Sequence, residues 1–262
     1  MGREKLMDIM QIMEARHAVR SYTDEPIAEA DAVALQEMVD RCNEESGLHC
    51  KLVLDEPKAF DSMLARYGKF TNVRNYLVLA GPPTADLEER CGYFGERLVL
   101  FAQERGLNTC WVALTFKKRF VRKVVDAGDK LVLVIALGHG ATQGAPHKSK
   151  DASDVVSFQD VDLSFGSDDD PESSRAADSD PEGSEEASPI PEWFARGVRA
   201  ALLAPTAMNQ QSFEIILTAA TSPEGKPYVD LVSKGGAYSS VDIGIVQLHF
   251  ELGAGTENFA WR

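Results

Sequence analysis

Arg16-His17-Ala18-Val19-Arg20-Ser21-Tyr22 follows a segment, residues 6–15, whose apolar side chains recur at helical spacing. A second basic cluster, Lys148-Ser149-Lys150, lies beyond a strand predicted over residues 130–137. Because charge-assisted hydrogen bonds to phosphate are strong and arginine forms them in pairs, four cations brought together would hold a dianion. From spacing alone, solvated surface charge is the simpler interpretation of both clusters.

The charge of the chain is concentrated in one segment. The 262 residues include 41 acidic and 27 basic side chains, for a formal net charge of −14. Between Asp151 and Glu192 there are 14 acidic residues and one basic residue, so the remainder is nearly neutral. Residues 165–190 hold few large apolar side chains and cannot offset their ordering entropy. We therefore predict a first part over residues 1–164, an acidic disordered linker over 165–190, and a second part over 191–262 that completes the same fold.

The composition is that of a soluble globular protein, with 44% apolar and 26% charged residues. The longest apolar run, residues 131–137, is too short to span a membrane, and the first residues do not form a signal peptide. We expect a cytoplasmic protein that binds neither membranes nor nucleic acid. The cysteines show no metal-ligand spacing and are expected to be reduced and mostly buried: Cys42, Cys50, Cys91 and Cys110.

Helices and strands are predicted to alternate along the chain, which indicates an α/β or an α+β class. The predicted helices cover residues 6–15, 29–45, 84–105, 117–125, 193–203 and 240–252. The predicted strands cover residues 51–54, 76–80, 109–114, 130–137, 213–219 and 228–232.

Most local motifs favour a structural interpretation over a catalytic one. Gly138-x-Gly140-x-x-x-Gly144 follows a strand, but Pro146 and a polar run stand where a dinucleotide-binding fold needs a helix. The histidines lack metal-ligand spacing and no G-x-S-x-G elbow exists. We expect His249 to be a satisfied, partly buried side chain and Cys110 to belong to the core.

Four segments together resemble the nitroreductase family. Residues 16–22 resemble its N-terminal flavin-binding signature, and Ala204-Pro205-Thr206-Ala207-Met208-Asn209-Gln210-Gln211-Ser212-Phe213 resembles its second signature. Gly106-Leu107-Asn108-Thr109-Cys110-Trp111 is similar to its G-L-G-T-C-W segment, and residues 138–150 are similar to its late loop ending in a basic pair.

The order of these segments departs from the common one. The Asn209 signature follows the acidic segment instead of the arginine cluster, and this rearranged order resembles a subgroup first seen in thermophilic bacteria. Ala18, Asn108 and Ser212 stand where the family often has serine, glycine and proline.

The resemblance implies an α+β fold with a central, mainly antiparallel sheet flanked by helices. It also implies a homodimer with FMN at its interface. Arg16, Lys148 and Lys150 would hold the phosphate and ribityl end, and Arg20 would lie near the pyrimidine edge of the flavin. The remaining contacts come from backbone amides and polar side chains: His17, Ala18, Leu107, Asn108, Thr109, Asn209 and Gln211.

The function implied is that of an FMN-dependent oxidoreductase with a ping-pong mechanism. Electrons would pass from NAD(P)H through FMN to a small acceptor such as a nitroaromatic or a quinone. No metal and no strong protein acid or base is required, since the flavin carries the chemistry. Two alternatives stay open: a flavin-binding protein without turnover, and an interaction protein acting through its acidic segment.

Overall fold

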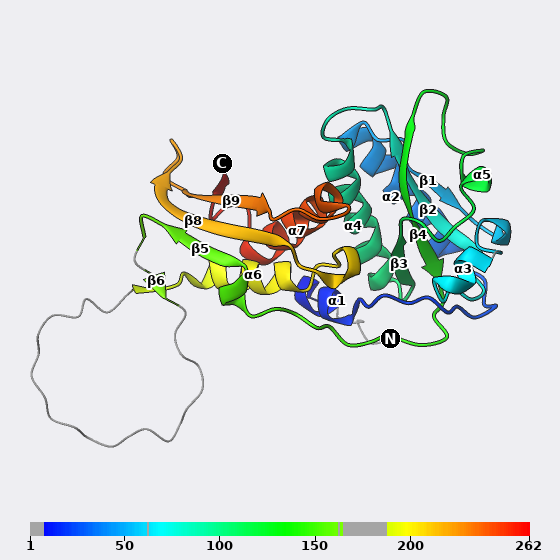
Figure 1. Ribbon diagram of the computed structural model, residues 1–262, viewed down its shortest axis with the longest axis horizontal. Helices are drawn as coiled ribbons and strands as arrows, with labels where there is room; N and C mark the ends of the chain where they lie inside the picture. The colour runs from blue at the N-terminus through cyan, green and yellow to red at the C-terminus, as the bar shows by residue number, and fades with distance from the viewer. Residues whose placement is uncertain (1–7, 62, 162, 165–187) are drawn as a thin grey trace, which may run out of the picture.

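The computed structural model describes residues 8–61, 63–161, 163–164 and 188–262 (Figure 1). Its α-helices are α1 Ile9–Ala15, α2 Glu29–Ser46, α3 Met63–Tyr67, α4 Leu87–Glu104, α5 Lys118–Val121, α6 Glu192–Leu202 and α7 Ser239–Ala254. Its strands are β1 Lys51–Val53, β2 Asn75–Gly81, β3 Asn108–Val112, β4 Lys130–Gly138, β5 Val156–Gln159, β6 Leu163–Ser164, β7 Ser188–Pro189, β8 Phe213–Thr221, β9 Pro227–Ser233 and β10 Ala260–Trp261. Short 3₁₀ turns, η1 Pro57–Ala59, η2 Ala152–Asp154 and η3 Ala207–Asn209, complete the described chain.

Most of the described strands lie in two four-stranded sheets. The first has the order β1-β2-β4-β3 and is antiparallel throughout. The second has the order β10-β9-β8-β5 and is mixed, because β5 and β10 are parallel to their neighbours while β8 and β9 are antiparallel. Strand β5 precedes the acidic segment and β8 follows it, so the two parts of the sequence share this sheet.

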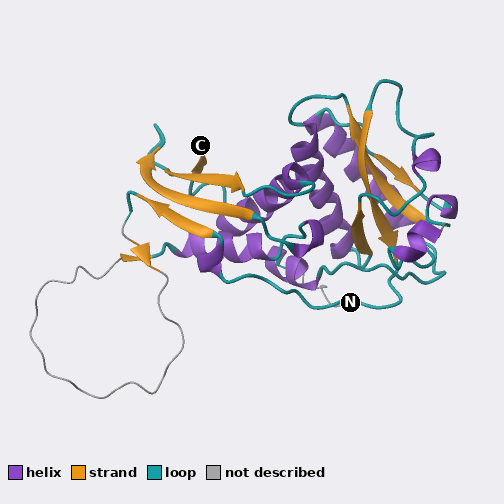
Figure 2. Cartoon of the chain, in the orientation of Figure 1, coloured by secondary structure: helices purple, strands orange, loops and turns teal. Residues whose placement is uncertain are grey.

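The long helices lie between the two sheets (Figure 2). Helix α7 packs against both α4 and α6. The contact with α4 depends on glycine, because a Cβ atom at Gly92 would collide with the Val241 carbonyl and one at Gly244 with the Glu89 carbonyl. The two helices therefore approach with backbone against backbone, and this contact joins the two parts of the chain.

A continuous apolar core extends across both parts. One cluster combines buried residues of β2 and α4, such as Leu79 and Leu98, with residues of α6 and α7, such as Phe194 and Phe250. A second cluster fills the opposite face of the antiparallel sheet, where Phe60 packs with Val121 of α5.

The same order of elements occurs before and after the acidic segment. Antiparallel strands β1 and β2 precede α4 and β3, and antiparallel strands β8 and β9 precede α7 and β10. Both long helices are followed by Asn-x-x-Trp, at Asn108–Trp111 and at Asn258–Trp261. In each case the indole nitrogen donates to a glutamate of the preceding helix, Trp111 to Glu96 at 2.9 Å and Trp261 to Glu251 at 2.7 Å.

The α+β class is confirmed, and most predicted elements are present with shifted ends. The helix predicted over residues 84–105 begins only at Leu87, because Pro82 and Pro83 lie just before it and Asp86 is its N-cap. The predicted basic helix is reduced to the four residues of α5. The elements α3, β5 and β10, of two to five residues each, were not predicted, because they are too short to show a periodic pattern.

The predicted linker, residues 165–190, lies largely outside the described residues. The described chain resumes at Ser188, where β7 pairs in parallel with β6. All four cysteines are buried and free, as expected for Cys42, Cys50, Cys91 and Cys110. Among the described helices, none has the length and apolar character needed to cross a membrane.

Candidate functional site

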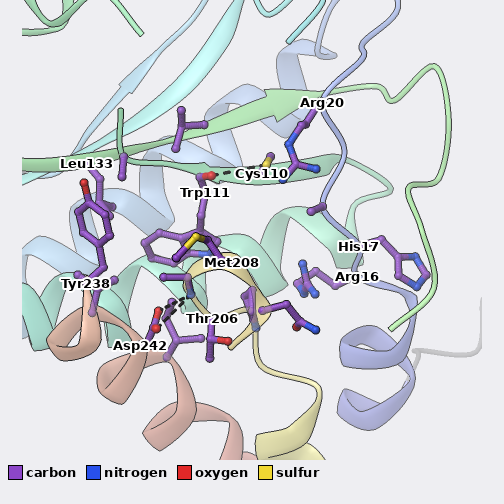
Figure 3. Close-up of a pocket in the computed structure, with 18 of the residues that line it drawn as sticks. Arg16, His17, Arg20, Cys110, Trp111, Leu133, Thr206, Met208, Tyr238 and Asp242 are labelled. Atoms are coloured by element: carbon purple, nitrogen blue, oxygen red, sulfur yellow. Dashed lines mark hydrogen bonds between the residues drawn. The ribbon is translucent and has the colours of Figure 1, made fainter. Parts of the chain in front are cut away.

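A cavity of about 700 Å³ lies where the two parts of the chain meet. Its walls come from the segment after α1, from β3 and β4, from the loop at residues 145–148, from η3, and from the first turns of α7. Figure 3 shows Arg16, His17 and Arg20 toward one end and Leu133, Tyr238 and Asp242 toward the other. The cavity is therefore polar and cationic at one end and largely apolar at the other.

The cationic end is held in place by backbone hydrogen bonds. Val19 N donates to the Thr109 carbonyl of β3 at 3.0 Å, and Thr23 N donates to the His139 carbonyl at 2.8 Å. The buried Tyr22 hydroxyl donates to the Val19 carbonyl at 2.7 Å. Residues 16–23 thus run along the edge strand of the antiparallel sheet, which turns Arg16 and Arg20 toward the cavity.

Two histidines at this end each have a buried ring nitrogen without a hydrogen-bond partner among the described residues. The rings of His17 and His147 lie 4.9 Å apart between centroids. The backbone of Gln143 raises the pKa of His17, and the backbone of Met13 and of Arg16 raises the pKa of His147, but burial outweighs both effects. At this end, the buried atoms without a hydrogen-bond partner in the described part of the chain are His17 Nδ1, His147 Nε2 and Arg16 Nε.

Burial sets the charge at this end. It lowers the pKa of Arg16, while nearby Glu96 raises it. Burial and the charge of Arg16 also lower the pKa of both histidines. In the free protein at neutral pH, the buried part of the cationic end therefore has charged Arg16 beside two neutral imidazoles.

The apolar end combines β3 and β4 with α7. Trp111 and Leu133 form one wall, and Tyr238, Val241 and Ile245 form the other. Asp242 lies in this wall and accepts a hydrogen bond from Ala207 N at 2.9 Å. Burial raises the pKa of Asp242 to about 6. This end can receive an aromatic or other apolar molecule beside one weakly acidic carboxyl group.

Two loops that border the cavity are bound to each other. Asn209 Nδ2 donates to the Lys148 carbonyl at 2.7 Å, and Lys150 N donates to Gln211 Oε1 at 2.7 Å. Lys150 Nζ donates to the Gln211 carbonyl at 3.0 Å, and Gln211 Nε2 donates to the Leu202 carbonyl at 2.8 Å. Met208, Asn209 and Gln211 all have positive φ, so the loop after α6 is sharply folded.

The structure brings six of the predicted site residues into the cavity wall: Arg16, His17, Ala18, Arg20, Lys148 and Asn209. It does not bring Lys150 or Gln211 there, because these two bind each other and Gln211 is 1% exposed. Leu107, Asn108 and Thr109 are buried and do not line the cavity. Asn108 instead accepts from Gly140 N at 2.9 Å and fixes the loop after β4.

The sequence assigned no role to most residues of the apolar end or to the buried polar residues behind the cavity wall. Trp111 lies in one of the segments that resemble the family but had no assigned role, and Leu133, Tyr238, Val241 and Asp242 belong to none of these segments. Glu96 and His249 are fully buried behind the wall, where Glu96 hydrogen-bonds both His249 and Trp111. Their partners are 153 and 15 positions away in the sequence, so no local pattern could indicate them.

Another cluster of potential ligands lies away from the cavity. His49, Asp126 and Asp129 come together among the described residues. His49 Nδ1 and Asp129 Oδ2 lie 2.7 Å apart, and Lys51 Nζ pairs with Asp126 at 2.8 Å. These groups satisfy each other, so the cavity remains the candidate site.

Comparisons with known proteins agree on one family. The model of a family described as "Putative TM nitroreductase" matches residues 8–254. A structure from Thermotoga maritima, described as a "putative nitroreductase", has a TM-score of 0.56 at 19% identity, over 97% of this chain and 86% of that one. This similarity shows a nitroreductase-like fold. No curated protein matches the sequence.

Two further solved structures are more distant. A "Putative NADH dehydrogenase/NAD(P)H nitroreductase" from Bacteroides thetaiotaomicron has a TM-score of 0.46 at 21% identity, covering 59% of this chain and 97% of that one. A "putative nitroreductase in complex with fmn" from Desulfovibrio desulfuricans has a TM-score of 0.46 at 15% identity, covering 58% of this chain and 96% of that one.

Proposed function

Because the chain belongs to the nitroreductase family whose model it matches, we propose that it is an FMN-dependent oxidoreductase that uses NAD(P)H. The observation that carries the proposal is a single cavity with a cationic end and an apolar end. FMN has the same division, with a phosphate at one end and an aromatic ring system at the other. When bound, FMN supplies hydride transfer between NAD(P)H and a small oxidised acceptor such as a nitroaromatic or a quinone.

The unpartnered polar atoms fit a phosphate group. Arg16 Nε, His17 Nδ1 and His147 Nε2 are buried at the cationic end without hydrogen-bond partners among the described residues. Leaving buried polar atoms unsatisfied is costly, so a ligand that supplies acceptors there would be stabilised. Arg16 and Lys148 would hold the phosphate by charge, and both histidines would donate to it once they are protonated.

The other residues would position the ring system and limit water. Trp111 and Leu133 offer apolar surface for one side of a ring and Val241 for the other, and Arg20 offers positive charge at its edge. A cation at that edge would favour negative charge on a bound ring system. Asp242 is the one carboxyl group in the described wall, and its raised pKa makes it a proton donor to a reduced acceptor at mildly acidic pH.

An absorption spectrum of the purified protein, before and after FMN is added, tests the proposal. We expect flavin bands, about one FMN per chain, and oxidation of NAD(P)H that depends on a quinone or nitroaromatic. A colourless protein that takes up no FMN would refute the proposal. Flavin binding without NAD(P)H oxidation would instead support the flavin-binding alternative.

The second alternative is that the chain is an interaction protein that acts through its acidic segment. Strands β6 and β7 pair directly before and after residues 165–187, so a short Gly/Ser linker can replace these residues. If flavin binding and turnover survive this replacement unchanged, the site does not depend on the acidic segment. The homodimer implied by the resemblance remains a prediction, which sedimentation at several protein concentrations checks.

A further inference from the structure

A buried pair of ionisable side chains lies directly behind the cavity wall. Glu96 of α4 and His249 of α7 are both 0% exposed, and Glu96 Oε1 lies 3.0 Å from His249 Nε2. The other carboxylate oxygen accepts the indole hydrogen of Trp111 at 2.9 Å, and Arg16 Nε lies 3.9 Å from Oε1. Trp111 and Arg16 both line the cavity, so Glu96 contacts two residues of the cavity wall from the protein interior.

The hydrogen bonds fix how many protons the pair holds. His249 Nδ1 lies 3.0 Å from the Ala200 carbonyl, which can only accept, so Nδ1 carries a hydrogen. The contact between Nε2 and Glu96 Oε1 then needs a second hydrogen, because two lone pairs would otherwise face each other at 3.0 Å. That hydrogen belongs to an imidazolium beside a carboxylate or to a carboxylic acid beside an imidazole, and both arrangements have zero net charge.

We propose that Glu96 and His249 share one proton, and that this neutral pair positions Trp111 and Arg16 while leaving the charge of Arg16 available to a bound anion. An ionised Glu96 beside a neutral histidine would cancel the charge of Arg16, and the phosphate end would lose its buried cation. The functional part of this inference rests on the proposed function, but the shared proton does not.

The surroundings contain few other ionisable groups. The segment after α1 contributes Arg16 with His17 beside it, the loop before Lys148 contributes His147, and β3 contributes Cys110, whose pKa burial raises. Helix α6 faces the pair with the Ala200 carbonyl. Glu251 on α7 is bound to Tyr93 and Trp261. The protonation state of the Glu96–His249 pair therefore acts mainly on Arg16, by setting how much of its positive charge is available to a bound anion.

The proton count can be measured without any flavin. NMR of the full chain at pH 7, with ¹⁵N-labelled histidine and ¹³C-labelled glutamate carboxyl groups, reports both partners, and the variants H249Q and E96Q assign their signals. We expect either an imidazolium at His249 or a protonated carboxyl at Glu96. A neutral imidazole beside an ionised carboxylate would overturn the inference, even if the chain binds FMN well.

The role of the pair is tested by the ratio of riboflavin to FMN dissociation constants, because riboflavin lacks the phosphate. In H249Q the glutamine can still donate to Glu96 but cannot share a proton with it, so an ionised Glu96 would offset the charge of Arg16 and the preference for FMN should fall about tenfold. The double variant E96Q/H249Q removes that carboxylate and should restore most of the preference.

A purely structural role predicts a different pattern. The double variant would then bind FMN no better than H249Q, and this result would overturn the positioning role. The matched control is E251Q, which alters a glutamate that also accepts from an indole but lies outside the cavity wall. Its FMN preference should equal that of the wild type. If H249Q does not fold, E96Q still assigns the Glu96 carboxyl signal in the NMR spectrum, and the protonation of that carboxyl group still decides the shared proton together with the histidine spectrum.

Discussion

Two neighbouring lysines that look equivalent in the sequence should behave differently toward FMN. Lys148 lines the cavity, whereas the ammonium of Lys150 donates to the Gln211 carbonyl at 3.0 Å. Replacing Lys148 with alanine removes one charge-assisted contact at an exposed position, about 1–2 kcal/mol. The dissociation constant of FMN should therefore rise about 5–30-fold, since about 1.4 kcal/mol corresponds to tenfold. The hydrogen bond from Asn209 survives, because it goes to the Lys148 backbone.

Lys150→Ala is the matched variant and should leave the affinity for FMN within about twofold. It should instead lower the free energy of unfolding by about 0.5–1.5 kcal/mol, the usual contribution of one intramolecular hydrogen bond. Fluorescence titration with FMN, repeated with riboflavin, measures the first effect, and denaturant unfolding measures the second. The reasoning is refuted if K150A weakens FMN binding as much as K148A, or if K148A weakens riboflavin binding equally.

Three further perturbations test other parts of the site. Burial and Arg16 lower the pKa of His17 and His147, so the free energy of unfolding should fall as the pH drops below about 6.5. FMN should bind more tightly in the same pH range, because the protonated histidines would donate to its phosphate. The double variant H17N/H147N should show a weaker pH dependence both of urea unfolding and of FMN affinity. Burial raises the pKa of Asp242 to about 6, so its contribution to stability is lost as the pH rises through that value. D242N should stabilise the protein by about 1–2 kcal/mol at pH 8 and by less at pH 4, and equal shifts at both would contradict this cause. Gly244→Ala puts a methyl group against the Glu89 carbonyl and should cost about 3 kcal/mol or more in thermal unfolding, with loss of FMN binding.

The sequence predicted the larger elements and the cationic segment because their signals are local. Helix α4 has apolar residues at regular spacing over five turns, and Arg16 and Arg20 stand in a motif of consecutive residues. A motif gives the position of a residue along the chain but not the direction of its side chain. Lys150 and Gln211 matched the pattern, yet they bind each other and not the cavity.

The rest of the site depends on contacts between distant positions. Glu96, Trp111 and His249 come from α4, β3 and α7, and their pairing follows from the packing of two glycine-bearing helices. Asp242 reaches the cavity because it binds the backbone of Ala207, 35 positions earlier. No alternation or helical period encodes such pairs, since each depends on the completed fold.

The packing of α4 against α7 explains why the cavity forms within one chain. The backbone of α4 meets that of α7 at Gly92 and Gly244, and the segment with Arg16 and the loop with Asn209 both line the same cavity. These segments lie on either side of the acidic segment in the sequence, and residues from both parts of the chain pack in one apolar core cluster. Binding by this site therefore requires correct association of the two parts, and any change that separates α4 from α7 should remove ligand binding before it removes either sheet.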